Sequence, residues 1–326
     1  MGYAKRRKVE RRGVSLEKTG STTSALKPYH LIVFILFILI PLSFATHKRN
    51  ATWRGKMMLW KDVVQKSPKN ARGHHNLGVA YLDKDRLDEA LREYTIALQI
   101  NPYARLPHNG LGDIYYKKGW VEEAIKEYLT AIKLNPDDAS SHNNLGVAYS
   151  KQGRFNDAVQ EYLTALRLRP DYPDAYINLG NIYYKHSRFD EAIREYSKAL
   201  RIDPNFAKAY NNLGNVYSDK GRYGEAVQEY KKALKLSPDY VNAYYNLGLV
   251  YYKQGRFDDA IQAYTTALRL DPQDADSHLN LGFAYWKKGL QHKAKEEIEI
   301  ALKLRPDFTL AQEAFKSIRK DPALSE

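Results

Sequence analysis

The chain has 326 residues and no cysteine, which excludes a disulfide framework, a thiolate zinc site and a cysteine nucleophile. Its formal net charge is +13. Residues 1–70 hold 15 Lys/Arg against 3 Asp/Glu, whereas residues 71–326 hold 36 against 35. Because binding to DNA or RNA needs positive charge on a folded surface, this distribution argues against a nucleic-acid partner.

The first part of the chain predicts a tail and a membrane segment. Residues 1–28 are basic and lack apolar periodicity, which predicts disorder. Residues 29–46 surround the apolar run LIVFILFILI and would form a helix about 27 Å long. Since a hydrocarbon core is roughly 30 Å thick, we predict a transmembrane signal anchor. A cleaved export signal, with Ser43 and Ala45 as its small residues, and a buried core helix remain alternatives.

Charges on the two sides of the apolar segment give conflicting signals about orientation. The tail holds eight Lys/Arg, which favours a cytoplasmic N-terminus. Close to the segment the bias reverses, because five basic residues follow it within residues 48–61 and only two precede it within residues 18–28. We predict a single-pass protein of the inner or plasma membrane whose larger part lies outside the cytoplasm.

From residue 71 the sequence repeats with a period of 34. Each unit has a Leu-Gly pair, a tyrosine three residues after the glycine, an alanine twelve residues after it and a closing proline. The glycines are Gly78, Gly112, Gly146, Gly180, Gly214, Gly248 and Gly282. Apolar residues at three- and four-residue spacing predict two amphipathic helices in each unit. Glycine costs roughly 1 kcal/mol inside a helix, so its recurrence predicts a close approach between the two helices.

These columns resemble tetratricopeptide repeats. The resemblance covers residues 71–308 and implies an all-α, right-handed superhelical solenoid of antiparallel helix pairs with a concave groove. The predicted units are 71–104, 105–138, 139–172, 173–206, 207–240, 241–274 and 275–308. Residues 47–70 are predicted to form a juxtamembrane segment with a half repeat, and residues 309–326 a capping helix and C-terminus. The junction 53–81 is similar to that of bacterial membrane proteins that end in such arrays.

Histidine recurs at the fourth position of four units. His74, His108, His142 and His278 share this column with Tyr176, Tyr210 and Tyr244. Members of one column lie a whole unit apart and cannot converge on one ion, so we predict a packing role and no metal site. The sequence also lacks a Gly-rich phosphate loop, an HExxH motif and a nucleophile elbow. We therefore predict no catalytic residues, no cofactor and no small-molecule substrate.

The candidate site lies on the first helices, which line the groove in the family that the sequence resembles. A column of asparagines resembles the ladder by which O-linked glycosyltransferases hold substrate polypeptides, and an amide can both donate to and accept from a peptide backbone. Exposed aromatic residues in a groove are plausible anchors for a ligand. The predicted peptide-binding residues are Asn76, Asn144, Asn178, Asn212, Asn246, Asn280, Asn181, Asn215, Tyr116, Tyr184, Tyr252 and Trp286. Alternatively, the asparagines bond neighbouring helices and have no ligand.

We predict a membrane-tethered scaffold that binds extended polypeptide and is not an enzyme. A second hypothesis is a substrate-recruiting or assembly subunit of a cell-envelope glycosyltransferase or polysaccharide system, with catalysis in a partner. A third is an enzyme with an unrecognised site. The sequence does not identify the partner, because groove chemistry sets the partner in such arrays.

Overall fold

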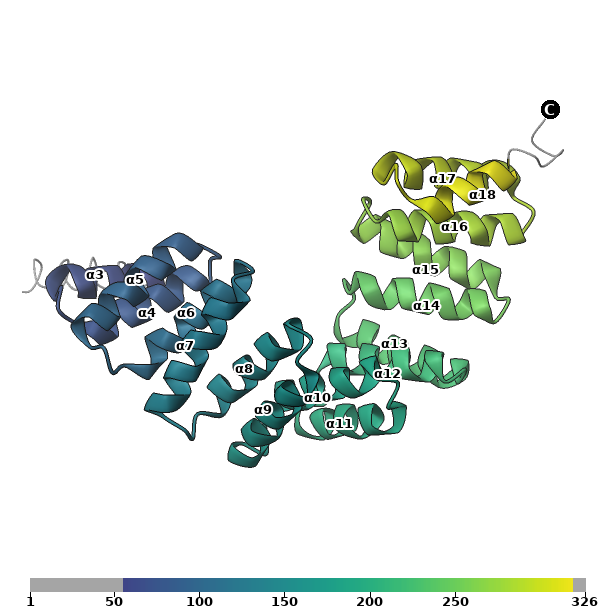
Figure 1. Ribbon diagram of the computed structural model, residues 1–326. Coiled ribbons are helices and arrows are strands. Elements are labelled where there is room, and N and C mark those ends of the chain that lie inside the picture. The colour runs from purple at the N-terminus through teal and green to yellow at the C-terminus, as the bar shows by residue number, and fades with distance from the viewer. Residues whose placement is uncertain (1–54, 319–326) are drawn as a thin grey trace, which may run out of the picture. The chain divides into compact units, whose positions relative to one another are not determined.

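The computed structural model describes residues 55–318. Within this range every regular element is an α-helix, and there is no strand. The helices follow one another in antiparallel pairs (Figure 1). The predicted membrane segment at residues 29–46 lies outside the described residues, and no helix within them is long and apolar enough to cross a membrane.

Seven helix pairs follow the period of the sequence. A single helix, α3 (Lys56–Lys66), precedes them, and α18 (Thr309–Ile318) follows them. The first helices of the units are α4 (Ala71–Leu82), α6 (Arg105–Lys117), α8 (Ala139–Lys151), α10 (Pro173–Lys185), α12 (Ala207–Asp219), α14 (Val241–Lys253) and α16 (Ala275–Lys287). The second helices are α5 (Leu87–Ile100), α7 (Val121–Leu134), α9 (Phe155–Leu168), α11 (Phe189–Ile202), α13 (Tyr223–Leu236), α15 (Phe257–Leu270) and α17 (Gln291–Leu304).

From α4 onward each helix packs on the next one along the chain, and the first helices of successive units also contact each other. No contact of comparable extent joins successive second helices within the described range. Consequently, side chains on the first helices can meet their equivalents from one unit to the next. Equivalent residues on the first helices can therefore form a continuous row along the array.

The repeated glycines make room for an aromatic ring. A Cβ atom built on Gly180 would lie 2.6 Å from Cε1 of Tyr196, which belongs to the second helix of the same unit and is 1% exposed. The same relation joins glycine and tyrosine in each of the first six units, and Ile298 replaces the ring in the seventh. The close approach predicted from the glycines is confirmed. It is a contact between helix backbone and a tyrosine ring, with the fully buried alanine column beside it.

Turns between the two helices of a unit require a left-handed residue. Five of them use glycine, with φ between +72° and +80°. In the other two turns Asp85 and Ser187 adopt φ values of +55° and +57°. A non-glycine residue in this region costs energy, so these two turns depart from the repeat at a measurable cost. The carboxylate of Asp85 is paired with Lys117 at 2.9 Å, whereas no side-chain hydrogen bond of Ser187 is seen within the described residues.

Candidate peptide-binding site

The ninth column of the first helices holds the centre of a repeated hydrogen-bond arrangement. In three units a side-chain Oδ1 accepts one bond from the tyrosine hydroxyl of its own unit and one from the asparagine Nδ2 of the next unit. These oxygens belong to Asp113 (2.7 Å from Tyr128, 3.0 Å from Asn144), Asn181 (2.8 Å from Tyr196, 2.9 Å from Asn212) and Asn215 (2.8 Å from Tyr230, 3.0 Å from Asn246).

The predicted asparagine column joins these centres into a ladder. Asn178 donates from Nδ2 to Oδ1 of Asn143 at 3.0 Å, and Asn246 donates in the same way to Asn211 at 3.1 Å. Each of these amides donates to the preceding unit. The ladder therefore ties neighbouring first helices together from the second unit to the sixth. The alternative interpretation held that the asparagines bond neighbouring helices and bind no ligand. The structure shows the bonds between helices.

The two ends of the column differ from its middle. Asn280 donates to the hydroxyl of Tyr245 at 3.2 Å and to the carbonyl of Asp276 at 2.9 Å. Asn76 is half-buried and makes no side-chain hydrogen bond to a described residue. Bonds from this column to the preceding unit therefore run from the third unit to the seventh, with a tyrosine hydroxyl as the acceptor in the last one.

Several polar atoms of the ladder remain available to a ligand. Both bonds to Asn181 use its Oδ1, so its Nδ2 has no partner among the described residues, and the same holds for Asn215. Neither nitrogen is a buried unsatisfied atom, so both are open to solvent. The Oδ1 of Asn178 is likewise an open acceptor. Because the bonds to Oδ1 fix each amide, the free N–H groups have a set orientation.

The predicted aromatic anchors are half-buried. The hydroxyl of Tyr184 donates to Asp219 of the next unit at 2.6 Å. The ring of Tyr252 lies 5.5 Å from that of Phe257, and Trp286 packs against the core of the last unit. Tyr116 packs against a core cluster that runs from the second unit to the fourth. These side chains thus contribute to packing and still present part of their rings to solvent.

Asp113 is the only acidic member of the three ladder centres. Burial raises the pKa of its carboxyl, and the hydrogen bonds from Tyr128 and Asn144 act in the opposite direction without cancelling that effect. The sequence showed Asp113 beside Asn181 and Asn215 in one column, but the paired tyrosines were not predicted as ladder partners. That partnership depends on the packing of the second helix onto the first.

The histidine column forms a second repeated arrangement, which joins the first helix of a unit to its second helix. In each of the four units the imidazole Nδ1 lies 2.6 Å from a glutamate of the second helix, and Nε2 faces a proline carbonyl at 2.9 to 3.5 Å. The glutamates are Glu93, Glu127, Glu161 and Glu297. Each of these rings therefore has an oxygen beside both of its nitrogens.

In two of the three units where tyrosine replaces this histidine, a lysine pairs with the glutamate instead. In the fourth unit Lys198 bonds Glu195 at 2.8 Å and lies 5.4 Å from the centre of the Tyr176 ring. Lys232 does the same with Glu229 and Tyr210 in the fifth unit. The exchange of His for Tyr plus Lys shows that the glutamate is paired in both cases. The histidine column thus makes hydrogen bonds within the protein in addition to the predicted packing.

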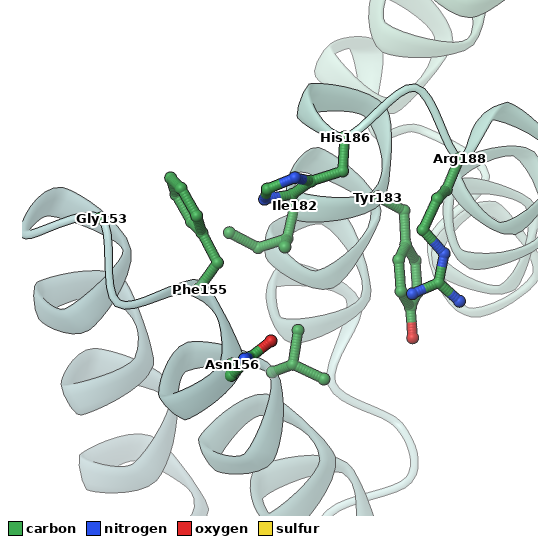
Figure 2. A pocket seen from close by; sticks show the side chains of 8 residues that line it. Gly153, Phe155, Asn156, Ile182, Tyr183, His186 and Arg188 are labelled. Carbon is green, nitrogen blue, oxygen red and sulfur yellow. The ribbon is translucent and has the colours of Figure 1, made fainter.

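A cavity of about 380 Å³ lies at the junction of the third and fourth units. Figure 2 shows the side chains of Phe155 and His186 on either side of Ile182, with Asn156 below them. At three other junctions a lysine and an aspartate bridge the equivalent positions, as Lys220 does to Asp190 at 2.8 Å. Asn156 and His186 cannot form this ion pair, and the space between them stays open.

Comparisons with known proteins agree with this architecture. Residues 138–320 match the family model of the Cilia and flagella-associated protein 70 C-terminal domain, which is more than half of the chain. Residues 71–104 and 112–153 match models of the tetratricopeptide repeat. The chain belongs to the tetratricopeptide repeat family. The resemblance drawn from the repeated columns is therefore confirmed.

Relatives of this tetratricopeptide protein differ in how much they share with it. The human protein O-mannosyl-transferase TMTC1 is 33% identical over 87 residues, which are 27% of this chain and only 9% of that protein. The crystal structure of the APC/C hetero-tetramer Cut9–Hcn1 has a TM-score of 0.68 at 18% identity, covering 80% of this chain and 52% of that one. PilF of Pseudomonas aeruginosa has a TM-score of 0.59 at 22% identity, covering 65% and 96%. At these identities the two structures show a shared fold.

Proposed function

We propose that this tetratricopeptide array is a protein-interaction scaffold that binds an extended polypeptide along its first helices. Stacked arrays of this kind typically present long binding surfaces and carry no catalytic site of their own. The observation that carries the proposal is the pair of fixed, solvent-facing N–H groups on Asn181 and Asn215. They stand on adjacent units, next to the open acceptor of Asn178, and together offer donors and an acceptor to a peptide main chain.

The aromatic residues supply the second part of the proposed site. Tyr184 and Tyr252 present half-buried rings on first helices that flank the amides. An aromatic ring gives contact area at low entropic cost, because it has only two side-chain torsions. Main-chain pairing by amides would give affinity without sequence preference, and the rings would select large side chains. Asn144 and Asn212 then act mainly by holding the ladder together.

The membrane tether belongs to the same proposal and rests on sequence alone. The apolar residues 29–46 would hold the array beside a membrane, so that it collects partner polypeptides there. A reporter enzyme fused after residue 326, active on only one side of the membrane, would determine the orientation. Full activity of the fusion in the soluble fraction would contradict the tether.

A related alternative is that the array recruits substrate for a glycosyltransferase. The similarity to human protein O-mannosyl-transferase TMTC1 favours it, because that protein is named for transferase activity. The matched part is a small share of that protein, so catalysis would reside in a partner of this chain. Co-purification of a glycosyltransferase with the chain, lost on changing the amides, would support this form of the function.

The test of the binding site uses a substitution that the chain itself contains. Asp113 occupies the ladder position with the same two hydrogen bonds that Asn181 and Asn215 accept. Asn181→Asp with Asn215→Asp therefore keeps the accepting Oδ1 atoms and replaces each free NH2 group with a carboxylate oxygen, which accepts hydrogen bonds and does not donate them. Peptides selected from a random phage-displayed library on the wild-type protein should bind the double variant at least about tenfold more weakly, since each charged or amide contact is worth on the order of 1 kcal/mol or more.

Two controls separate binding from folding. The far-ultraviolet circular dichroism of the double variant should match that of the wild type, because the ladder remains bonded. Asn144→Ala should instead lower stability, because it removes the donor to Asp113. If the selected peptides bind the double variant as tightly as the wild type, the amides are structural only and the proposed site is wrong.

A further inference from the structure

The second helix of each unit carries a glutamate at its seventh residue, with one exception. The glutamates are Glu93, Glu127, Glu161, Glu195, Glu229 and Glu297, and Ala263 stands at this position in the sixth unit. The carboxylates of the six other units are sheltered, with side chains 9 to 25% exposed, and each is paired with a histidine or a lysine. Each of these six units thus holds one paired glutamate at this place.

Loss of the acid in the sixth unit coincides with a cavity. About 460 Å³ of open space lies between α13, α14 and α15, and Ala263 and Thr266 line it. Thr266 occupies the position at which the fourth and fifth units carry Lys198 and Lys232. Tyr244 lines the cavity at the position of Tyr176 and Tyr210, so the sixth unit keeps the tyrosine and lacks both the glutamate and the lysine.

The charges around this cavity are mainly positive. Lys231, Arg256 and Arg269 line it, and Asp259 is the only acid among its lining residues. Asp259 is already bonded by Arg256 at 2.7 Å. Lys231 and Arg269 make no ion pair with any described residue, and a lysine at the Lys231 position occurs in no other unit. The apolar floor, which includes Leu234 and Leu247, lowers the local dielectric and strengthens attraction to an anion.

We propose that this cavity binds a carboxylate from an acidic side chain of a partner polypeptide, at the place that the chain's own glutamate fills in the six other units. The shape suits a carboxylate on a short aliphatic stem, because the space is what a glutamate side chain and its lysine leave when they are absent. The two unpaired cations supply the charge that the incoming carboxylate needs. The site lies on α13 to α15 and shares no residue with the amide ladder, so it is independent of the proposed peptide-binding function.

Titration of the full chain with a fluorescein-labelled oligoglutamate, followed by fluorescence anisotropy, tests the proposal. Ala263→Glu with Thr266→Lys rebuilds the arrangement of Tyr176, Glu195 and Lys198 and fills the cavity from within. Because the chain contains that arrangement twice, this variant should fold. The probe should bind it at least about tenfold more weakly than the wild type, which is the loss expected from one charge-assisted contact. A labelled oligoglutamine should bind neither protein comparably.

A charge-matched pair of variants separates the site from general electrostatics. Lys231→Gln with Arg269→Gln removes two positive charges at the cavity and should weaken binding by a similar factor. Arg201→Gln with Lys208→Gln removes two positive charges elsewhere and should change it by less than about twofold, because exposed charges beyond a Debye length are screened. Equal weakening by the two pairs, or undiminished binding to the rebuilt variant, overturns the proposal. Displacement of the probe by inorganic phosphate at lower concentration than by acetate would also overturn the assignment to a carboxylate.

Discussion

The same substitution, glycine to alanine, should have opposite effects at two places in the fifth unit. A Cβ on Gly214 would lie 2.5, 2.7 and 2.9 Å from Cε1, Cδ1 and Cζ of Tyr230, a ring that is 1% exposed. Carbon atoms normally approach to about 3.5–4.0 Å, so the ring must move by about 1 Å. A Cβ on Gly224, in the first turn of α13, meets nothing within 4 Å.

The sizes of the opposing free-energy contributions determine whether each substitution stabilises or destabilises the chain. Overpacking at Gly214 costs about 1–3 kcal/mol. Displacement of Tyr230 also weakens its 2.8 Å bond to Asn215, at about 1 kcal/mol, while alanine returns about 1 kcal/mol of helix propensity. Gly214→Ala should therefore lower the free energy of unfolding by about 1–3 kcal/mol. Gly224→Ala should raise it by about 0.5–1 kcal/mol, since only the entropy of the unfolded chain changes.

Urea unfolding followed by circular dichroism measures both changes. Because stability in repeat arrays depends mainly on nearest neighbours, hydrogen exchange of peptides from α12 and α13 should locate the loss in the fifth unit. If Gly214→Ala is as stable as the wild type, the ring is not confined as the distances imply. If Gly224→Ala destabilises equally, backbone freedom and not the tyrosine contact explains the glycines.

Three further outcomes follow from the polar contacts. Tyr230→Phe should lower the unfolding free energy by about 1 kcal/mol, because it removes the hydrogen bond to Asn215. Tyr264→Phe should be neutral or stabilising, because the buried hydroxyl of Tyr264 has no partner among the described residues. Urea titrations of the two variants in parallel test the difference. Asp113→Asn should stabilise the chain at neutral pH, with the gain disappearing in acid, since burial raises the pKa of the carboxyl and favours its uncharged form; a pH series of thermal midpoints that shows no gain would contradict this. Burial lowers the pKa of His278, but the hydrogen bonds to Glu297 and the Pro272 carbonyl outweigh it and raise the pKa overall. Its stabilisation is then complete below the ordinary histidine pKa of about 6.5 and lost as pH rises through the raised one, so the advantage of the wild type over His278→Gln should shrink as the pH rises above the ordinary value.

Much of the fold could be predicted from the sequence, because each repeated residue type has a local structural reason. The period of 34, the glycines and the closing prolines fixed the number of helices and their pairing, and the structure confirms both. Two turns carry no sequence signal, because Asp85 and Ser187 adopt a left-handed conformation that a residue other than glycine does not indicate. The position of the membrane segment at residues 29–46 remains a prediction from sequence alone.

The candidate site could likewise be predicted only in part. The sequence by itself determined which residues recur, and so it predicted the asparagine column and the aromatic positions. Only the tertiary structure decided which atoms of these side chains are used, because hydrogen bonds between units depend on how first helices pack and on tyrosines from second helices. Asn181 and Asn215 are the residues with free donors, and Asn144 and Asn212 are held by their neighbours. The asparagines of two different columns thus have different roles, since a side chain's partners are set by neighbours about thirty residues away, which no local pattern specifies.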